Sequence, residues 1–473
     1  MDWRRCQEIT RRKQIRYALL SRGEIARLEA TSIQELVAYE NVLNNPTEFD
    51  FQVEHLGEAQ YLNPSSSEIF VDDMERIIFS SQLKNLKHQL ETCTEIPSFE
   101  KAGARQKIFH NPEFSQAAII TCGGLCPGLN NVIKGLVNVL EMDYGVKNIL
   151  GIRYGYKGLT QASTQPPIQL NSLTVDQIHK QGGTILGSSR GNQDPEEMVD
   201  ILQAKGINLL FCIGGDGTLK GAQAIAEAAT RRQANISVVG VPKTIDNDLG
   251  FVEKTFGFET SVQTASEIIT SAQHEAEGAE NGIGIVKLMG RDSGFITATA
   301  SLANSVVDFC LIPETRFQIS GPNGIGAAVE RRIKQKNHAV IVVAEGAGQE
   351  LFTSKEKKID ASGNILKEDI GELLIEELTA HFKQRNISIN IKYLDPSYHI
   401  RSVPANASDA VFCHLLAEYA VHAGMSGKTN LVIGFWNNFF THVPIHLATK
   451  ERRMVELDSA LWRGVISATH QDK

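Results

Sequence analysis

The sequence contains no apolar run that approaches the ~20 residues of a membrane-spanning helix. Cysteine is scarce, with seven scattered residues in a chain of 473. The odd number and the lack of a dense framework disfavour a disulfide-stapled scaffold and predict a reduced, cytoplasmic setting. Positive charge is also in deficit, because the formal net charge is -8. A general nucleic-acid binder usually has a basic face, so that class is disfavoured, although a local basic pocket for small anions is compatible with an acidic protein.

Two nucleotide-binding signatures are missing as well. No Gly-x-x-x-x-Gly-Lys-Ser/Thr run occurs, which excludes a P-loop NTPase, and no Gly-x-Gly-x-x-Gly run supports a nicotinamide-dependent dehydrogenase. Cys122 and Cys126 have no second Cys or His pair beside them, so packing against a glycine loop is favoured over a zinc site. The basic stretch from Arg4 to Arg16 resembles a transit peptide in charge, but nearby glutamates and few serines favour an amphipathic surface helix.

The pattern of the chain predicts an α/β fold with mainly parallel sheets. Residues 1–112 form an N-terminal extension with helical periodicity over 16–43 and 71–90, so we expect it to be largely helical. From residue 113 onward, short apolar runs alternate with helix-like segments, which is typical of parallel βαβ units. We expect two Rossmann-like three-layer domains that face each other across a cleft. The strand-like runs lie at 117–121, 149–154, 209–213, 238–241, 283–287 and 340–344.

Two loops carry the strongest chemical signal, and each follows a strand-like run. The first, Gly214–Thr218, places Asp216 among three glycines, which suits close approach of a phosphate and a carboxylate ligand for Mg²⁺. The second, Pro242–Asp248, offers a lysine, a threonine and two aspartates. In an extended segment Thr244, Asp246 and Asp248 share one face, where one carboxylate can act as a base toward a hydroxyl. A simple turn explains either loop taken alone.

Other loops add weaker signals of the same kind. Gly123–Asn130 lies between a strand and a helix, a position where backbone N–H groups bind anions. Gly182–Arg190 supplies a small-residue turn and an arginine that can neutralise a transferring phosphoryl group. Lys287–Gly294 follows another strand-like run, and 345–348 and 393–401 supply further polar groups. Each of these has a plain structural explanation by itself.

The ordered set of loops is specific where the single loops are not. Gly-Gly-Leu-Cys-Pro-Gly-Leu-Asn, Gly-Ser-Ser-Arg, Gly-Gly-Asp-Gly-Thr, Pro-Lys-Thr-Ile-Asp-Asn-Asp, Met-Gly-Arg and Ala-Glu-Gly-Ala-Gly resemble the 6-phosphofructokinases, in the family's order. The resemblance covers roughly residues 115–445 and is strongest to the longer ATP-dependent enzymes of plant and trypanosomatid type. It implies phosphorylation of fructose 6-phosphate with Mg²⁺ and ATP, and a homotetramer or homodimer.

The resemblance also implies roles for matching residues. Asp246 would deprotonate the 1-hydroxyl of fructose 6-phosphate, Thr244 and Asp248 would position the reacting groups, and Asp216 would help to hold Mg²⁺. The expected donor-binding residues are Gly124, Arg190, Gly215, Asp216, Gly217, Thr218 and Lys243; the expected sugar-phosphate residues are Thr244, Asp246, Asp248, Met289, Gly290, Arg291, Glu345, Tyr398 and Arg401. The nucleotide would bind a domain of residues 113–260, to which 396–445 return, and the sugar phosphate a domain of residues 261–395, with 446–473 as a C-terminal tail.

The phosphoryl donor is the main choice that the resemblance leaves open. Pyrophosphate-dependent members typically have Asp at the position of Gly217, where a carboxylate would obstruct and repel the α-phosphate of ATP. Lys243 is shared with the pyrophosphate-dependent branch, whereas many short bacterial ATP-dependent enzymes have glycine there. Because the long ATP-dependent forms combine this glycine with this lysine, we predict ATP, with a pyrophosphate-dependent fructose 6-phosphate 1-phosphotransferase as the alternative.

Some positions depart from the short bacterial forms. Gly282 stands where those enzymes have an arginine that reaches a neighbouring subunit, and Tyr398 stands where they have histidine. Two effector-site positions are Lys134 and Asn138, which puts bacterial-style control by nucleotide diphosphate in doubt. A catalytically silent regulatory subunit is a further hypothesis, and a lipid or NAD kinase shares the Gly-Gly-Asp-Gly loop but not the loop around Asp246.

Overall fold

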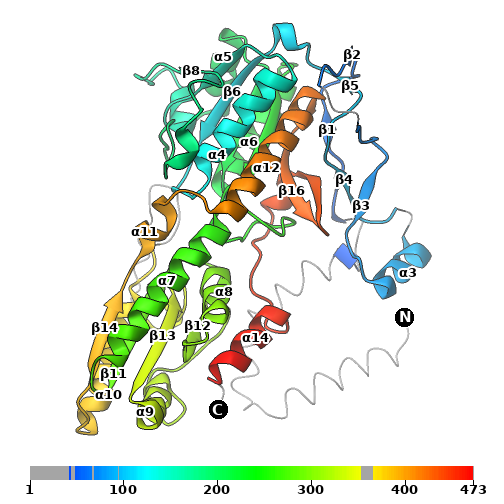
Figure 1. The fold of residues 1–473 in the computed structure, drawn as a ribbon. Coiled ribbons are helices and arrows are strands. Elements are labelled where there is room, and N and C mark those ends of the chain that lie inside the picture. Colours follow the sequence, from blue (N-terminus) through cyan, green and yellow to red (C-terminus); the bar gives the residue numbers. More distant parts are fainter. Residues whose placement is uncertain (1–41, 44–47, 66–68, 94, 353–365, 472–473) are drawn as a thin grey trace.

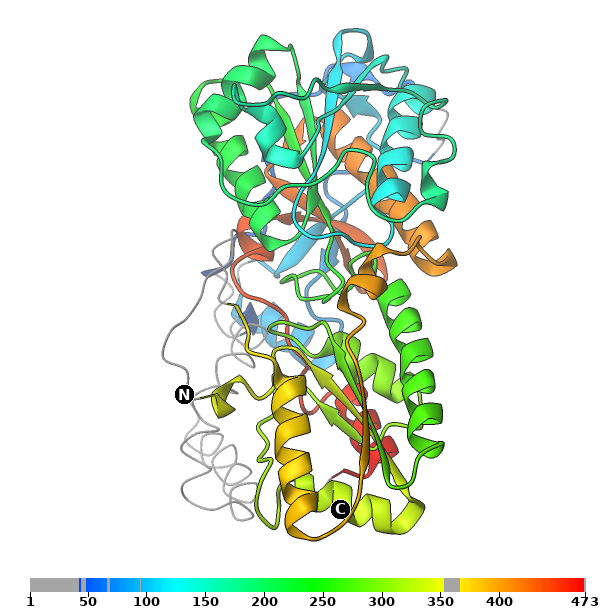
Figure 2. The ribbon, with the colours of Figure 1, turned by 90° about the vertical axis from the view of Figure 1, so that its left-hand side faces the viewer.

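The strand-like runs form two separate sheets, each in its own lobe of the molecule (Figure 1). The computed structural model describes residues 42–43, 48–65, 69–93, 95–352 and 366–471. Figure 2 shows the two lobes one above the other, and each sheet lies between two layers of helices. The predicted fold class of two three-layer α/β units with mainly parallel sheets is confirmed.

The larger lobe contains a nine-stranded sheet. Its five central strands are mutually parallel, and antiparallel strands extend both edges. Buried parallel strands need apolar side chains on both faces, which explains why Leu209–Gly214 and Ser237–Pro242 are buried at every position. In spatial order the strands are β3 (Arg76–Ile78), β4 (Ser98–Lys101), β17 (Phe439–Pro444), β16 (Leu431–Trp436), β10 (Ser237–Pro242), β9 (Leu209–Gly214), β6 (Gln116–Thr121), β7 (Asn148–Gly151) and β8 (Ile168–Leu170).

Helices cover both faces of this sheet. On one face α4 packs against α12, and on the other α5 packs against α6. The short helix α13 contacts α6 and β17. The bounds are α4 (Leu129–Asn138), α5 (Pro195–Ala204), α6 (Asp216–Arg231), α12 (Ala407–Met425) and α13 (Ile445–Ala448).

The smaller lobe is built on four parallel strands in the order β12-β13-β11-β14. Helices α7 and α8 cover one face, and α9 and α10 pack against the strands and against each other on the other side. The C-terminal helix α14 packs on α8 at this lobe (Figure 1). The bounds are β11 (Gly282–Leu288), β12 (Phe309–Leu311), β13 (His338–Ala344), β14 (Asn390–Leu394), α7 (Phe258–Glu277), α8 (Phe295–Ala303), α9 (Ile325–Lys336), α10 (Ile370–Gln384), α11 (Ser397–Ser402) and α14 (Ala460–Thr469).

The N-terminal extension differs from its prediction as a largely helical segment. In the part that the structure describes, α3 (Leu83–Thr92) is helical, but the first half of the predicted helix over 71–90 contains strand β3 instead. Strands β3 and β4 continue the large sheet beyond β17, and β1 (Glu54–His55) pairs with β15 (Lys428–Thr429). Strand β2 (Tyr61–Leu62) pairs with β5 (Lys107–Ile108). The helix predicted over 16–43 lies almost entirely outside the described residues.

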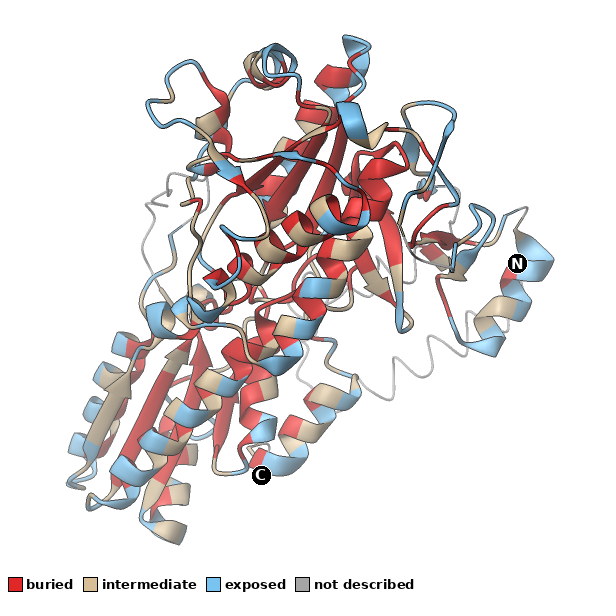
Figure 3. Ribbon diagram, turned by 45° about the horizontal axis from the view of Figure 1, so that its top comes forward, coloured by how far each residue is buried: buried red, intermediate tan, exposed pale blue. Residues whose placement is uncertain are grey.

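Buried residues gather on the sheets and on the inner faces of the helices (Figure 3). One apolar cluster joins helices α4 and α12 of the large lobe to helices α7 and α8 of the small lobe. The two lobes therefore share part of their core. Within the described residues, no helix is long and apolar enough to cross a membrane.

Candidate active site

Loops from both lobes meet around the predicted aspartates. Gly123–Gly128 follows β6, Gly215 follows β9 and Lys243–Asp248 follows β10, all at the carboxyl ends of parallel strands where open α/β sheets bind ligands. From the small lobe, Met289–Ser293 follows β11. The hydroxyl of Ser293 donates a hydrogen bond to the carbonyl of Asp246 at 3.3 Å, so the two sets of loops are in contact.

Three cations surround the first glycine loop. The Lys243 ammonium donates to the carbonyl of Gly124 at 2.8 Å. A Cβ atom added to Gly124 would lie 3.4 Å from Nη1 of Arg401 and 3.6 Å from Nη2 of Arg190. Burial is the main cause that lowers the pKa of Lys243, and the positive charges of Arg190 and Arg401 lower it further. Such a cluster of positive charge is stabilised by bound phosphate.

Two hydrogen bonds connect the Gly182–Arg190 loop to the first glycine loop. Gly123 donates its N–H to the carbonyl of Ser189 at 3.0 Å, and the Ser188 hydroxyl donates to the carbonyl of Gly123 at 2.6 Å. These bonds fix Arg190 beside Gly124. The predicted donor-binding residues Gly124, Arg190 and Lys243 are therefore neighbours in space, and Arg401, predicted to bind the sugar phosphate, lies with them.

The Gly215–Thr218 segment forms the start of α6. Gly215 is the N-cap, and the following N–H groups at the helix N-terminus favour a negatively charged ligand. A Cβ atom added to Gly217 would have no heavy atom within 4 Å, so this position faces open space. Thr218 differs from its three neighbours, because its side chain is buried against Gly214 in the body of the lobe. Its backbone N–H donates to the carbonyl of Gly215 at 2.9 Å, so Thr218 lies next to the predicted donor residues Gly215 and Gly217.

Asp216 fits a magnesium ligand by its position and charge. Its side chain is 22% exposed and pairs with Lys220 at 3.1 Å. Its negative charge acts on both Asp248 and Arg452, so it lies near the aspartate loop. No group of three or more His, Cys, Asp or Glu side chains in the described ranges could hold a metal by itself. Mg²⁺ commonly uses only one or two carboxylates together with substrate phosphates, so a lone Asp216 suits it.

The aspartate loop is a turn, which is the alternative that the sequence left open, and it is not the extended segment in which the three side chains would share one face. Asn247 has a φ of 52° and leaves the strand conformation. Its side chain fixes this geometry by accepting from the N–H of Thr255 at 2.9 Å and donating to the carbonyl of Glu253 at 3.1 Å. The Thr244 hydroxyl accepts from the N–H of Asp246 and donates to Asp248, both at 3.1 Å. Thr244 therefore connects the two aspartates.

The two aspartates have contrasting environments. Asp248 is buried, and its two oxygens accept from Thr244 at 3.1 Å and from Arg452 at 3.1 Å. In Asp246, Oδ1 is shielded from solvent and has no hydrogen-bond partner among the described residues. One carboxylate is therefore held in place, while the other keeps a buried oxygen available to a ligand.

The pKa of Asp246 lies well above its usual value. Burial is the largest cause, and the negative charges of Asp248 and Glu345 add to it, while Arg452 opposes the shift. Burial also raises the pKa of Asp248, against the effects of Arg452 and the Thr244 hydroxyl. Two nearby carboxylates that repel each other give one of them the proton affinity that a general base needs near neutral pH.

The small lobe presents its predicted residues on two interlocked loops. Gly346 donates its N–H to the carbonyl of Gly290 at 3.1 Å, and Glu345 donates its N–H to the carbonyl of Leu288 at 2.9 Å. Gly290 has a φ of 131°, a conformation that a side chain would strain. Burial raises the pKa of the Glu345 carboxyl, and the positive charge of Arg291 counteracts this shift. Met289, Gly290, Arg291 and Glu345 are thus brought together beside Asp246.

Tyr398 lies at the edge of this arrangement. Its side chain is 74% exposed, and the Arg401 guanidinium lies 4.7 Å from the centre of its ring. Both residues belong to α11, one turn apart. Tyr398 therefore reaches the other predicted residues through its cation–π contact with Arg401.

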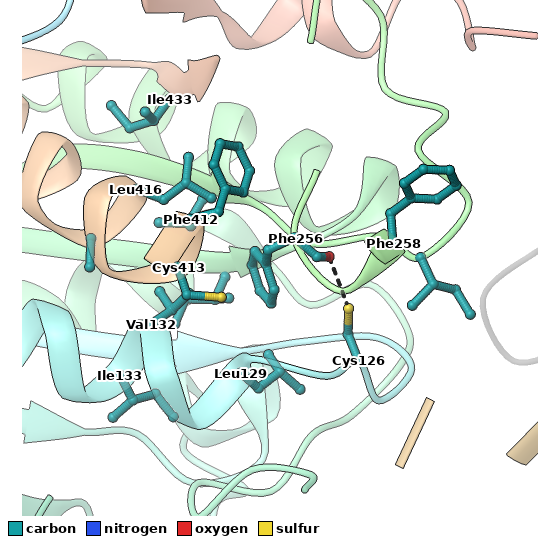
Figure 4. Packing of buried hydrophobic residues seen from close by; sticks show 14 of the residues in the cluster. Cys126, Leu129, Val132, Ile133, Phe256, Phe258, Phe412, Cys413, Leu416 and Ile433 are labelled. Carbon is teal, nitrogen blue, oxygen red and sulfur yellow. Dashed lines mark hydrogen bonds between the residues drawn. The ribbon is translucent and has the colours of Figure 1, made fainter. Parts of the chain in front are cut away.

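Apolar side chains of α4 and α12 pack with Phe256 and Cys126 beside the first glycine loop (Figure 4). Cys126 donates its thiol to the carbonyl of Phe256 at 3.2 Å, which ties the first glycine loop to the segment after the aspartates. Gly128 and Gly257 have φ values of 100° and 90°, and a Cβ atom on Gly128 would lie 2.6 Å from Sγ of Cys413. Only glycine allows this close approach. Cys126 is thus a packing residue of the core, as the sequence favoured.

The family model for phosphofructokinase matches residues 116–424. The chain belongs to the phosphofructokinase family. The match begins at the first residue of β6 and ends within α12, so it spans all the loops described above.

Relatives of this phosphofructokinase chain are found in bacteria, trypanosomes and plants. The ATP-dependent 6-phosphofructokinase of Borreliella burgdorferi is 49% identical over 435 residues, which are 89% of this chain and 97% of the relative. The protein of the same name from Trypanosoma cruzi is 43% identical over 435 residues, covering 90% and 89% of the two chains. ATP-dependent 6-phosphofructokinase 7 of Arabidopsis thaliana is 48% identical over 375 residues, covering 79% and 77%.

Solved structures of the family share the fold at low identity. A pyrophosphate-dependent phosphofructokinase from Nitrosospira multiformis is similar with a TM-score of 0.61 at 18% identity, covering 75% of this chain and 92% of the other. Pichia pastoris phosphofructokinase in the T-state has a TM-score of 0.58 at 21% identity. The matched region covers 76% of this chain and 39% of the Pichia chain. At these identities the likeness concerns the fold alone.

Sequence reasoning missed two charged residues of this phosphofructokinase site. Arg452 donates from Nη1 to Asp248 at 3.1 Å and to Asp292 at 2.9 Å. Asp292 belongs to the Lys287–Gly294 loop, but the sequence pattern assigned it no role. Arg452 lies in the C-terminal tail, where the sequence has no motif. These partners are 204 and 160 residues from Arg452 in the sequence. No local pattern could have indicated the contact.

Proposed function

We propose that this chain transfers the terminal phosphoryl group of ATP to the 1-hydroxyl of fructose 6-phosphate and forms fructose 1,6-bisphosphate, a step of glycolysis. The observation that carries the proposal is the buried, unpartnered Oδ1 of Asp246, in a carboxylate with a raised pKa at the junction of the two lobes. The names of the relatives that cover nearly all of the chain support the same activity.

The cations around the first glycine loop bind and orient the phosphates. Lys243, Arg190 and Arg401 lie together at Gly124, and the N-terminus of α6 adds positive potential from backbone N–H groups. Charge on the transferring group is spread over its equatorial oxygens, so preorganised cations stabilise the transition state. We assign the phosphates of the donor to the large lobe and the sugar phosphate mainly to Arg291, Glu345 and their neighbours in the small lobe.

Asp246 serves as the base of the reaction. The 1-hydroxyl of the sugar donates a hydrogen bond to Oδ1 of Asp246 and loses its proton to this oxygen as the hydroxyl oxygen attacks the phosphorus. The bond between that phosphorus and the bridging oxygen breaks, and ADP leaves with the bond's electron pair. A raised pKa makes Asp246 a stronger base than an exposed aspartate, and Thr244 and Asp248 hold its loop in place.

ATP rather than pyrophosphate is the donor that Gly217 favours. The open space around this residue leaves room for the α-phosphate and nucleoside, whereas an aspartate there would fill the space with a negative charge. The alternative, pyrophosphate-dependent activity rests on the resemblance of Lys243 to that branch, whereas the buried position of its ammonium suits either donor. The relatives at 43% to 49% identity are named as ATP-dependent, which supports the first choice.

Mg²⁺ is the metal that we assign to this reaction, with Asp216 as its protein ligand. The ion would neutralise charge on the donor phosphates.

We also propose a cytoplasmic location and a homotetramer or homodimer. Light scattering of the purified protein measures the oligomeric state directly.

The decisive experiment measures fructose 1,6-bisphosphate formation by purified protein with Mg²⁺ and fructose 6-phosphate, with ATP and pyrophosphate in parallel. Turnover with ATP alone supports the proposal. Turnover with pyrophosphate alone means that Lys243 is the better guide to the donor. The absence of turnover with both donors contradicts the proposed activity and favours a regulatory subunit. Asp246→Ala should lose activity by several orders of magnitude, since near-normal turnover would exclude this base.

A further inference from the structure

The C-terminal tail connects the two lobes next to the aspartate loop. Helix α13 packs on the large lobe and α14 on the small lobe, so residues 449–459 pass from one to the other. Along this path Leu249 and Arg452 form an antiparallel bridge, and Arg453 donates its N–H to the carbonyl of Asp248 at 2.8 Å. The tail therefore runs alongside the aspartate loop as an additional strand-like partner.

Arg453 and Glu314 fix the course of the tail. The Arg453 guanidinium donates to the carbonyls of Val252 and Glu253, both at 2.8 Å, and lies 4.9 Å from the centre of the Phe295 ring. On the small-lobe side, the Glu314 carboxylate accepts from the N–H groups of Gly294 and Val455, both at 2.8 Å. These contacts hold the backbone on either side of Arg452 against both lobes.

Arg452 then links one carboxylate from each lobe. Its Nη1 donates to Asp248 of the large lobe at 3.1 Å and to Asp292 of the small lobe at 2.9 Å. The Asp248 side chain is 9% exposed and that of Arg452 34% exposed, so this contact is partly shielded from water. Asp292 in turn accepts from Lys367 at 2.9 Å. One guanidinium nitrogen thus contacts a carboxylate from each lobe, and such a network of charges contributes more than an isolated surface ion pair.

We propose that Arg452 is a positioning residue for phosphoryl transfer, which seats Asp248 and couples the aspartate loop to the small lobe through Asp292. This inference rests on the proposed function and deepens it. Without the guanidinium, Asp248 loses the partner of one oxygen, and the Asp248 and Asp292 carboxylates lose the cation that lies between them. The loop that carries Asp246 then shifts relative to the sugar-phosphate residues beside Met289–Arg291. Displacements of about 1 Å at a reacting centre cost about a hundredfold in rate.

The test compares Arg452→Met with Arg452→Lys and with Lys450→Met as a matched control. Methionine keeps much of the apolar stem of arginine, so its effect isolates the charge, and lysine restores the charge without the fork. Lys450 is a cation of the same tail that lies 4.2 Å from the centre of the Phe49 ring, away from the aspartates. We expect kcat to fall about a hundredfold in Arg452→Met with less than a threefold change in the KM for fructose 6-phosphate. Arg452→Lys should recover at least tenfold, and Lys450→Met should match the wild type.

Asp292→Asn tests the link between the lobes. If Asp292 acts through Arg452, the double variant with Arg452→Met should be no slower than Arg452→Met alone. Multiplication of the two single losses would overturn the coupling. Retention of kcat within threefold in Arg452→Met, or a loss in KM alone, would overturn the positioning role.

Hydrogen exchange separates this inference from the proposed function. Peptides covering 244–252 and 289–295 should exchange faster in Arg452→Met and not in Lys450→Met, whether or not turnover is seen. Unchanged exchange in either peptide would overturn the link. If the wild type and Lys450→Met both lack turnover while exchange changes as expected, the proposed function fails and the link between the lobes stands.

Discussion

Replacement of Asp246 by Asn should lower activity and raise stability at the same time. Asparagine has nearly the shape of aspartate but carries no charge and cannot take a proton at neutral pH. In the wild type, Oδ1 of Asp246 is shielded from solvent without a partner, and the nearby charges of Asp248 and Glu345 oppose its ionisation. The feature that makes this carboxylate a base therefore also destabilises the folded protein.

The expected loss of activity follows from the role of a general base, which contributes about 10²–10⁴ in rate. This corresponds to about 3–5 kcal/mol of transition-state stabilisation. Asparagine keeps a buried polar oxygen at this place and removes only the charge, so the expected gain is the extra cost of burying an unpaired charge, on the order of 1–3 kcal/mol. The free energy of unfolding should accordingly rise by about this amount at pH 7.

The difference in stability between the Asp246→Asn variant and the wild type should depend on pH. Because the folded-state pKa of Asp246 is raised above 3.8, folding favours the protonated form. The stability that protonation contributes is fully present below pH 3.8 and is lost as the pH rises through the higher folded-state pKa. The asparagine side chain cannot ionise, so the advantage of the Asp246→Asn variant over the wild type should be small at acid pH and should grow toward neutral pH.

Thermal unfolding and steady-state turnover on the same preparations measure both effects. Glu58→Gln is the matched control, because Glu58 is an exposed acid in the N-terminal extension and its replacement removes the same charge. We expect the control to retain activity and to lack the pH-dependent gain. A variant of Asp246 that is inactive but less stable than the wild type at pH 7 would refute the reasoning about burial. A variant that keeps turnover would refute the assignment of the base.

Four further outcomes follow from the site and its core. The kcat/KM of the wild type should fall on the acid side with an apparent pKa well above 3.8, since Asp246 must be ionised to accept a proton; a limb at 3.8 would contradict its raised pKa. Gly217→Ala should keep ATP turnover because the added Cβ meets nothing within 4 Å, whereas Gly217→Asp should lose at least about tenfold in kcat/KM for ATP. Equal losses of kcat/KM in the two variants would exclude repulsion between the aspartate and ATP as the cause. Lys243→Met should lower kcat by about a hundredfold, measured with saturating ATP. A change confined to KM would mean that the ammonium binds the substrate but does not stabilise the transition state. Gly257→Ala should destabilise the fold by about 2–5 kcal/mol, because its φ is 90° and the new Cβ meets Cys126. Gly145→Ala, at a φ of 76° in open space, should cost about 1–2 kcal/mol, and similar denaturation midpoints of the two variants would contradict the contact with Cys126.

The strands of the two sheets could be predicted because their signal is local. A buried parallel strand needs an apolar run, and the run at 209–213 is strand β9 with one added residue. Strand β7 covers only the first part of the predicted 149–154, since the chain turns at Tyr154 with a φ of 57°. The short strands of the N-terminal extension were missed because two to four residues have no recognisable period. Two of them, β1 and β4, pair with β15 and β17 from the far end of the chain.

The candidate site was predictable where its residues follow strands directly. Gly124, Asp216 and Asp246 each come within four residues of the end of a strand, and the topology brings these ends together. For the loop at Asn247 the sequence left an extended segment and a turn open, and the choice between them depends on contacts with Glu253 and Thr255 outside the motif. The position of Arg401 beside Arg190 depends on how α11 returns to the large lobe, which no local pattern encodes.

The same contacts explain why the repulsion in the aspartate loop raises a pKa instead of moving the loop. Two carboxylates that repel would separate if their backbone could relax. Here Asn247 is bound through its side chain to the backbone at 253 and 255, and Arg453 holds the carbonyls of Val252 and Glu253. With the backbone held, the repulsion adds to burial in raising the pKa of Asp246, the carboxylate whose Oδ1 has no partner. Residues remote from the motif thus determine which of its two aspartates can act as the base.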